Sequence, residues 1–266
     1  MVERNELILV YFATVRRITL LYMKSTAIII PTRLKAKRFP NKPLAKIKNI
    51  PMIVHVVNRA KEATVGQVIV ATPDQEIIDI VKKNGGQAIL TKNEHPSGSD
   101  RVYEAYLKML ENKVDLIINL QGDMPNIEPN SISKLEKLMR NNNCDIGTLS
   151  SSIKNKDELE DINIVKLQVD KDLNDNEFLD VKDFFRKSNY LDNKKIYHHI
   201  GIYAFTNTSL KKYVELNRSK LEIERNLEQM RAMENNMVIK TGYTDSYPLG
   251  VDTDKDLEKV EKEMSH

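Results

Sequence analysis

The stretch Ala27–Pro43, A-I-I-I-P-T-R-L-K-A-K-R-F-P-N-K-P, gives the strongest indication of the fold class. It opens with a short apolar run rich in β-branched side chains, which is typical of a strand buried on both faces of a sheet. A loop follows that holds five cations and no acid, and three prolines restrict its path. The cations are Arg33, Lys35, Lys37, Arg38 and Lys42. Because open α/β sheets bind ligands beyond the carboxyl ends of their strands, this loop marks a candidate binding site.

Strands and helices alternate after this stretch, as far as residue 151. We expect strands at 67–72, 88–91, 115–121 and 145–151, and helices at 75–84, 99–110 and 129–140. Gly85-Gly86 should end the first of these helices, since glycine readily adopts the left-handed conformation found at helix C-termini. The alternation predicts βαβ units around a mostly parallel sheet.

The pattern changes from about residue 160. Two apolar runs at 164–169 and 178–181, separated by D-K-D-L-N-D-N-E, predict a hairpin. The remaining expected elements are a strand at 198–205, helices at 208–215 and 221–235, a strand at 238–241 and a last helix capped by Thr253 with Asp256. The simplest organisation is one α/β domain over residues 24–266, with an inserted antiparallel arm at about 160–196.

The composition excludes several classes of protein. With 41% hydrophobic and 30% charged residues the chain has a globular profile. Its net charge of +3 is too small to indicate binding to duplex nucleic acid or to an anionic membrane. Aromatic residues at 6% offer few platforms on which single-stranded nucleic acid could stack. The single cysteine, Cys144, rules out an internal disulfide framework, so a reducing, cytoplasmic location fits best.

The first 23 residues differ from the rest of the chain. Leu7–Val15 and Ile18–Met23 are apolar, but neither run approaches the roughly 20 residues that a membrane-spanning helix needs. The start carries Glu3 and Glu6, unlike the basic start of a signal peptide. We therefore expect residues 1–23 to be a dispensable extension, and we expect no membrane anchor.

Three loops, together with the segment around Asp252, contain residues suited to a polyphosphate and a metal ion. The guanidinium and ammonium groups of the basic loop suit a polyphosphate. Asp123 and Asp252 each follow a glycine-containing turn, and two carboxylates with a triphosphate would complete an Mg²⁺ shell. Ser97–Ser99 open a helix whose free amides can bind polar or anionic groups.

Each of these motifs also has an ordinary structural interpretation. The basic loop could be a solvated surface, Asp123 could cap a turn, and the serines could simply cap a helix. Neither G-x-x-x-x-G-K-[ST] nor G-x-G-x-x-G occurs, which disfavours P-loop kinases and dinucleotide dehydrogenases.

Seven motifs together resemble the 3-deoxy-manno-octulosonate cytidylyltransferase (CMP-Kdo synthetase) family. They are A-I-I-I-P-T-R…K-R-F-P-N-K-P-L, V-I-V-A-T, H-P-S-G-S-D-R, N-L-Q-G-D-M-P, H-I-G-I-Y, L-E-Q-M-R and G-V-D-T, spread from about Thr26 to Met264. The resemblance implies a Rossmann-like nucleotidyltransferase fold, a mostly parallel mixed sheet flanked by helices, with an antiparallel dimerisation arm. It also implies a cytoplasmic homodimer that needs Mg²⁺ and binds neither nucleic acid nor membrane.

The implied reaction is the transfer of CMP from CTP to the anomeric hydroxyl of 3-deoxy-D-manno-octulosonate (Kdo), with release of pyrophosphate, for lipopolysaccharide biosynthesis. By matching position, the resemblance assigns phosphate contacts to Arg33, Arg38 and Lys42. It assigns the surroundings of the cytidine to Thr72, Ser97 and Gly98, with Arg101 supporting that loop or the nucleotide. It assigns Mg²⁺ to Asp123 and Asp252. It assigns the sugar-acid pocket to Gln121, His199, Tyr203, Glu228 and Gln229, with Arg186 facing the Kdo carboxylate. Arg33, Lys42, Asp123 and Asp252 would be the catalytic residues.

Some of these side chains have alternatives on the residues alone. His199 and Tyr203 are four residues apart on one expected strand and so share a face, whereas His198 faces the other side. That face could line a pocket or belong to the core. Glu228 and Gln229 could lie on a solvated helix face. Two other functions also stay open: activation of another acidic sugar, such as a sialic-type nonulosonate, and nucleotide binding without catalysis.

Overall fold

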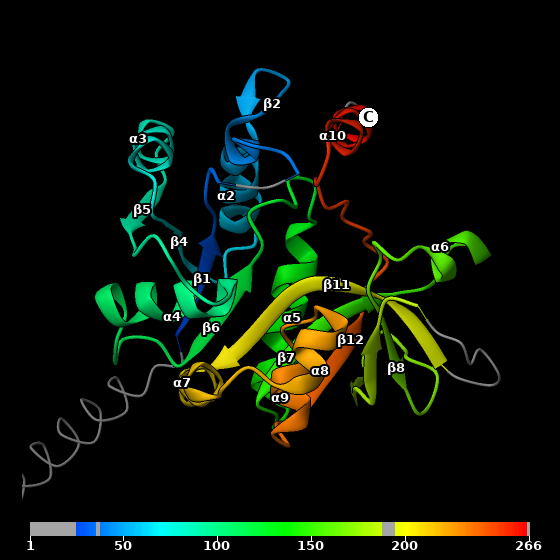
Figure 1. The fold of residues 1–266 in the computed structure, drawn as a ribbon. Helices are drawn as coiled ribbons and strands as arrows, with labels where there is room; N and C mark the ends of the chain where they lie inside the picture. The colour runs from blue at the N-terminus through cyan, green and yellow to red at the C-terminus, as the bar shows by residue number, and fades with distance from the viewer. Residues whose placement is uncertain (1–24, 36–37, 188–194, 265–266) are drawn as a thin grey trace, which may run out of the picture.

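The computed structural model describes residues 25–35, 38–187 and 195–264. Its main sheet has the order β5-β4-β1-β6-β11-β7-β12-β9, and β8 and β10 extend it beside β11 (Figure 1). The strands are β1 (Thr26–Pro31), β2 (Lys46–Ile47), β3 (Ile50–Pro51), β4 (Gly66–Thr72), β5 (Gln87–Leu90), β6 (Leu116–Leu120), β7 (Ile146–Ser151), β8 (Lys166–Val169), β9 (Phe178–Asp180), β10 (Asp183–Phe185), β11 (Lys195–Thr206) and β12 (Ile239–Tyr243).

Helices cover both faces of this sheet. They are the short 3₁₀-helix η1 (Lys42–Leu44), α2 (Met52–Glu62), α3 (Gln75–Lys83), α4 (Gly98–Met109), α5 (Pro129–Asn141), α6 (Lys156–Glu160), α7 (Asn207–Glu215), α8 (Lys220–Arg225), α9 (Met230–Glu234) and α10 (Asp254–Glu263). One apolar core contains side chains of α2, α3 and α5, and the other contains side chains of α4, α7 and α9. The protein is therefore a three-layer α/β structure.

The first strand lies in the middle of the sheet because its side chains are apolar on both faces. Ile28 and Ile30 point into one core, whereas Ala27 and Ile29 point into the other. β1 pairs in parallel with β4 and β6, β4 pairs in parallel with β5, and β7 pairs in parallel with β12. β11 runs antiparallel to β6 and β7 between them. The predicted mixed, mostly parallel sheet is confirmed.

Local signals at two helix ends are also confirmed. Gly85 has φ 73°, the left-handed conformation expected just after α3. Thr253 begins α10 as its N-cap, and its side chain accepts a hydrogen bond from the amide of Asp256, whose side chain bonds back in a capping box.

The predicted hairpin between 164–169 and 178–181 is wrong. β8 pairs with β10 and β11, whereas β9 pairs with β12. The cause is long-range packing: Phe178 on β9 enters the α5 core, and its ring lies over Gly147 of β7, where a Cβ atom would come within 2.9 Å of it. Leu167 on β8 packs instead into the other core, which also contains Phe184 of β10.

The predicted helix at 221–235 is interrupted. α8 ends at Arg225, and Asn226 adopts the left-handed conformation with φ 52°. Glu228 and Gln229 therefore lie in the turn between α8 and α9 rather than on a helix face. The two short helices are held together by Arg231, whose Nε and Nη2 each lie 2.9 Å from a carboxylate oxygen of Glu222.

Some elements of the structure were not predicted, and some predictions concern residues outside the described ranges. The β2–β3 hairpin, α2, α6 and β10 were not predicted from the sequence. The interpretation of residues 1–23 as an extension falls outside the described residues, as does part of the predicted arm. Over the described ranges, no helix is long and apolar enough to span a bilayer.

Candidate active site

A cavity of about 440 Å³ opens at the carboxyl ends of β1 and β6. Six of the predicted site residues line it: Arg33, Arg38, Lys42, Gln121, Asp123 and Asp252. The remaining lining residues are Pro31, Thr32, Lys35, Phe39, Pro43 and Gly122. The predicted ligand site is thus lined by three segments: the basic loop, the loop after β6 and the segment before α10.

Backbone contacts hold the basic loop over this cavity. The amide of Leu34 donates to Asp74 Oδ2 at 2.7 Å, and the amide of Asn41 donates to the carbonyl of Leu34 at 3.0 Å. Gly122 lies directly beneath the start of the loop, where a Cβ atom would lie 3.1 Å from Thr32 Cβ. A side chain at position 122 would therefore push the loop and Asp123 apart.

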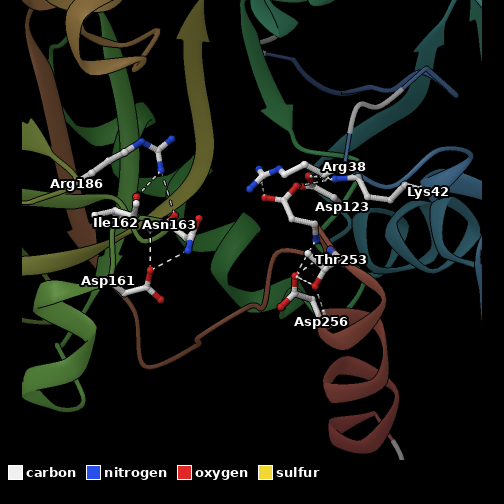
Figure 2. Close-up of polar contacts among 10 residues, drawn as sticks. Arg38, Lys42, Asp123, Asp161, Ile162, Asn163, Arg186, Thr253 and Asp256 are labelled. Atoms are coloured by element: carbon white, nitrogen blue, oxygen red, sulfur yellow. Dashed lines mark hydrogen bonds and ion pairs between the residues drawn. The ribbon is translucent and has the colours of Figure 1, made fainter.

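The two predicted metal-binding carboxylates converge on one ammonium group (Figure 2). Lys42 Nζ donates to Asp123 Oδ2 at 2.8 Å and to Asp252 Oδ1 at 3.2 Å. Arg38 Nη2 donates to the other oxygen of Asp252 at 2.7 Å. The amide of Val251 also donates to the carbonyl of Asp123 at 3.0 Å, which joins the two chain segments directly. Burial alone would lower the pKa of Lys42, but the negative charges of Asp123 and Asp252 raise it above its usual value.

This arrangement fits a small divalent cation that takes part of its shell from a ligand. Carboxylate oxygens are the protein ligands that Mg²⁺ prefers, and Mg²⁺ usually needs only one or two of them beside phosphate oxygens. Within the described ranges, no cluster of three or more His, Cys, Asp or Glu side chains could hold a metal ion. A metal at Asp123 and Asp252 would therefore depend on oxygens that arrive with the ligand.

The start of α4 faces the same cavity. A Cβ atom at Gly98 would lie 3.7 Å from Pro31 Cγ and 4.0 Å from Gln121 Oε1. Ser97, the N-cap residue, donates from Oγ to Asp100 Oδ2 at 2.7 Å rather than capping the helix through its side chain. The predicted cytidine loop is thus adjacent to the predicted phosphate loop.

Arg101 and Thr72 act as supports in this region rather than as exposed contacts. Arg101 is buried, and it donates to Thr91 Oγ1 and to the carbonyl of Lys92, the latter at 2.8 Å. Burial and the nearby charge of Arg33 lower its pKa. Thr72 is fully buried, and its Oγ1 accepts a hydrogen bond from the amide of Asp74 at 3.2 Å. These contacts join Arg101 to the segment that follows β5, which is the geometry that a supporting role requires.

His199 and Tyr203 share a face of β11, as expected, with ring centroids 5.3 Å apart. Both are buried, at 6% and 7% exposure, and His199 packs edge-on against Phe184 at 5.1 Å. Burial, with the neighbouring His198, lowers the pKa of His199 to about 3, so this imidazole is neutral near pH 7. His198 faces the other side, where Glu158 lies 2.6 Å from its Nδ1. His199 and Tyr203 therefore form a wall of the core rather than part of the open cavity.

Glu228 and Gln229 meet Tyr203 and Ser99 around a small internal space of about 10 Å³. Glu228 Oε1 accepts a hydrogen bond from Ser99 Oγ at 3.1 Å. Burial raises the pKa of Glu228, although the hydrogen bond from Ser99 opposes this. Burial also raises the pKa of Tyr203, and the charge of Glu228 adds to that effect. These side chains are desolvated and close together, unlike residues on a solvated helix face.

Arg186 lies apart from the phosphate cavity, as Figure 2 shows. Its Nη1 donates to the carbonyls of Ile162 and Asn163 at 3.1 and 3.2 Å. The neighbouring Lys166, which is fully buried, donates to the carbonyls of Asp161 and Ile164 at 2.7 and 2.9 Å. The charge of Arg186 nevertheless acts on Tyr203, since it opposes the rise that burial causes in the pKa of that phenol. Arg186 is thus associated with the Tyr203 region rather than with the ion pairs of the cavity.

Sequence reasoning assigned no role to Asn119, a buried polar residue that links the parts of the site. Asn119 donates from Nδ2 to Ser99 Oγ at 3.2 Å, and Gln121 donates from Nε2 to Asn119 Oδ1 at 3.1 Å. An asparagine inside the apolar run L-I-I-N-L of β6 was a signal, because its side chain shares a face with Gln121 two residues later.

Comparison with known proteins agrees with this geometry. A model of the cytidylyltransferase family matches residues 27–239. The 3-deoxy-manno-octulosonate cytidylyltransferase of Bartonella tribocorum is 43% identical over 236 residues, which cover 88% of this chain and 96% of the relative. The enzyme of the same name from Rhodopseudomonas palustris is 40% identical over 242 residues, covering 91% of this chain and 98% of the relative.

Solved structures give the same result. The structure of CMP:2-keto-3-deoxy-manno-octonic acid synthetase complexed with CTP has a TM-score of 0.82 and 36% identity, and the match covers 91% of this chain and 99% of that one. UTP-bound UGPase from Acinetobacter baumannii shares the fold alone, with a TM-score of 0.64 and 13% identity over 92% of this chain and 95% of that one. The chain therefore belongs to the 3-deoxy-manno-octulosonate cytidylyltransferase family.

Proposed function

We infer that this chain transfers CMP from CTP to the anomeric hydroxyl of Kdo and releases pyrophosphate, as the names of its relatives indicate. The observation that supports this most directly is the cavity in which Arg38, Lys42, Asp123 and Asp252 converge. That group of charges lies at the carboxyl ends of β1 and β6, where an open α/β sheet binds its ligand.

The chemistry requires stabilisation of negative charge more than it requires a nucleophilic side chain. The anomeric oxygen forms a bond to the α-phosphorus, the bond from that phosphorus to the bridging oxygen breaks, and its electron pair leaves with pyrophosphate. The hydroxyl proton passes to solvent or to a base that we do not assign. Arg33, Arg38 and Lys42 face the cavity and would contact the phosphate oxygens on which charge accumulates. The rest of the rate enhancement would come from holding the two substrates in line.

We propose that Asp123 and Asp252 hold Mg²⁺. The ion, when bound, would supply positive charge to the phosphate oxygens. Lys42 and Arg38 already balance both carboxylates in the structure. A cation should therefore bind here mainly together with the negative charge of CTP, which gives Lys42 and Arg38 new partners.

We further propose that the sugar acid binds between Gln121 and the region of Tyr203, Glu228 and Gln229, with Arg186 toward its carboxylate. Arg186 follows β10, whose Phe184 packs against His199 at 5.1 Å, and His199 lies 5.3 Å from Tyr203, which supports this placement. We also propose a cytoplasmic homodimer that uses the arm at about 160–196 and supplies activated Kdo for lipopolysaccharide biosynthesis. Ile162, beside Arg186, is 60% exposed and is available for such an interface.

Pyrophosphate release with Mg²⁺, CTP and Kdo tests the reaction. Matched reactions should contain a sialic-type acid in place of Kdo, or another nucleoside triphosphate in place of CTP. We expect release only with CTP and Kdo. Release with the sialic-type acid instead would keep the chemistry and overturn the choice of acceptor. CTP binding without release for any acid would indicate a non-catalytic nucleotide-binding protein.

A further inference from the structure

A continuous chain of hydrogen bonds joins the phosphate cavity to the space around Tyr203. It runs from Gln121 Nε2 to Asn119 Oδ1 at 3.1 Å, from Asn119 Nδ2 to Ser99 Oγ at 3.2 Å, and from Ser99 Oγ to Glu228 Oε1 at 3.1 Å. Asn119 and Ser99 have exposures of 0% and 1%, so water does not compete for these groups. The relay connects three segments that are far apart in the sequence: β6, the start of α4 and the turn between α8 and α9.

When Glu228 is ionised, the count of donors leaves only one direction for the relay. An ionised Glu228 accepts hydrogen bonds and donates none, so the single hydroxyl proton of Ser99 is used on that carboxylate. Ser99 Oγ must then accept from Asn119, which requires the NH₂ group of the Asn119 amide to face Ser99. The oxygen of that amide consequently faces Gln121 and must receive a proton from the Gln121 NH₂ group. The charge of Glu228 thus fixes the orientation of two amides in turn.

The last amide in the relay belongs to a side chain that lines the cavity. With Nε2 turned inward, Gln121 presents Oε1 to the start of α4, where a Cβ atom at Gly98 would lie 4.0 Å from that oxygen. A Cβ atom at Gly201 on β11 would lie 3.9 Å from Gln121 Cγ, so β11 limits the side chain on the other side. Gln121 Oε1 is therefore the atom of this amide that can accept a hydrogen bond from a molecule in the cavity.

We propose that Asn119 and Ser99 are positioning residues that hold the Gln121 amide with its oxygen toward the cavity, where it accepts a hydrogen bond from a hydroxyl of the sugar acid. This inference rests on the proposed function, because it needs an acceptor sugar beside Gln121. Neither positioning residue has to touch a substrate. Losing the Ser99 hydroxyl should let the Asn119 and Gln121 amides rotate, so that Gln121 sometimes presents NH₂ groups to a hydroxyl that needs an acceptor.

A matched pair of variants tests the role of the hydroxyl. Ser99→Thr keeps the donor, whereas Ser99→Val has almost the same shape as threonine but no hydroxyl. We expect Ser99→Val to raise KM for Kdo by about tenfold, the usual effect of one lost or misdirected hydrogen bond. KM for CTP should stay within about twofold, and Ser99→Thr should restore KM for Kdo. Equal KM values for Kdo in the two variants, or a rise confined to CTP, would overturn the proposal.

A measurement that does not depend on turnover separates this inference from the proposed reaction. In the ¹⁵N-labelled protein, the side-chain NH₂ protons of Asn119 and Gln121 should exchange slowly with solvent in the wild type and in Ser99→Thr. They should exchange faster in Ser99→Val. Unchanged exchange in Ser99→Val would disprove the relay. Failure of the wild type to release pyrophosphate with Kdo, with the exchange pattern as expected, would instead disprove the proposed acceptor and leave the relay standing.

Discussion

The site has two parts that differ in exposure. In the cavity with Arg38, Lys42, Asp123 and Asp252, the proposed phosphate end, charged side chains meet solvent. Around Tyr203, Glu228 and Gln229, the proposed acceptor end, polar side chains are enclosed. Arg38 and Asp252 pair with side-chain exposures of 62% and 48%. His199 and Gln229, by contrast, have exposures of 6% and 5%. Exposed ion pairs contribute little to folding stability, while a buried polar group that loses its partner is costly.

This contrast suggests that the two ends are specialised in different ways. The phosphate end holds charges that can exchange one partner for another when a charged ligand arrives. The acceptor end, which includes the α8–α9 turn, fixes the direction of neutral and desolvated groups through the fold. Substitutions at the proposed phosphate end should therefore affect catalysis with little effect on stability, whereas loss of the buried ion pair that holds α8 to α9 should mainly reduce stability.

Asp123→Ala should have the largest effect on turnover. We expect kcat to fall by about a thousandfold, because the variant loses one of the two carboxylates that we propose hold Mg²⁺ at the phosphates. The melting temperature should change by only about 2 °C, since Lys42 keeps Asp252 as a partner. Pyrophosphate release and thermal unfolding measure the two effects, and Asp245→Asn, at an exposed site, is the control. A large loss of stability together with the loss of activity would contradict the proposed contrast.

Arg231→Met should be the converse case. Arg231 and Glu222 form a buried ion pair with side-chain exposures of 2% and 3%, and removing Arg231 leaves the buried Glu222 carboxylate with only the half-exposed Arg218 as a partner. We expect the free energy of unfolding to fall by about 3–5 kcal/mol in urea denaturation.

Arg218→Met is a matched control for this variant, because Arg218 pairs with the same Glu222 at 2.9 Å but is 50% exposed. Its loss should reduce the free energy of unfolding by at most about 1 kcal/mol. Equal losses in the two variants would show that burial does not distinguish these pairs.

Lys42→Met should change metal binding in the absence of nucleotide. With the ammonium gone, two carboxylates lose the cation between them, so we expect Mn²⁺, used as a probe, to bind about tenfold more tightly to the nucleotide-free variant. Electron paramagnetic resonance titration measures this. Arg38→Met should give a smaller increase, because Arg38 is more exposed. Weaker Mn²⁺ binding by Lys42→Met would show that Lys42 organises these carboxylates rather than competing with a cation.

Substitution of Glu104 should have a small effect on stability that depends on pH. Burial would raise its pKa, but hydrogen bonds from Lys108, the Lys92 amide and His95 lower it from 4.5 to about 2. A carboxyl group whose pKa is lowered by folding adds to the stability of the protein. This contribution is complete above the pKa of the unfolded state, and it is lost as the pH falls through the pKa of the folded state. Glu104→Gln should therefore cost about 1–2 kcal/mol near neutral pH. The difference from wild type in urea denaturation should vanish as pH falls toward about 2, and a constant difference would contradict this assignment.

The sequence determined the parts of this protein that depend on neighbouring residues. A-I-I-I predicts a strand that is buried on both faces whatever its partners, and Gly85 and Thr253 set helix ends through their own backbone and side-chain chemistry. The same holds for the phosphate end, since loops that follow parallel strands must meet at one edge of the sheet. The pattern of the sequence alone was therefore enough to bring Arg38, Lys42, Asp123 and Asp252 together, and they do line one cavity.

Strand pairing and the hydrogen bonds around Glu228 depend instead on long-range packing. A period of two tells which side chains share a face but not which strand lies alongside, so Phe178 joined β9 to β12 against the local expectation of a hairpin. The break at Asn226 turned Glu228 toward Ser99, a residue 129 positions earlier in the chain. A hydrogen bond between such distant residues depends on the packing of whole helices, which no local sequence pattern records.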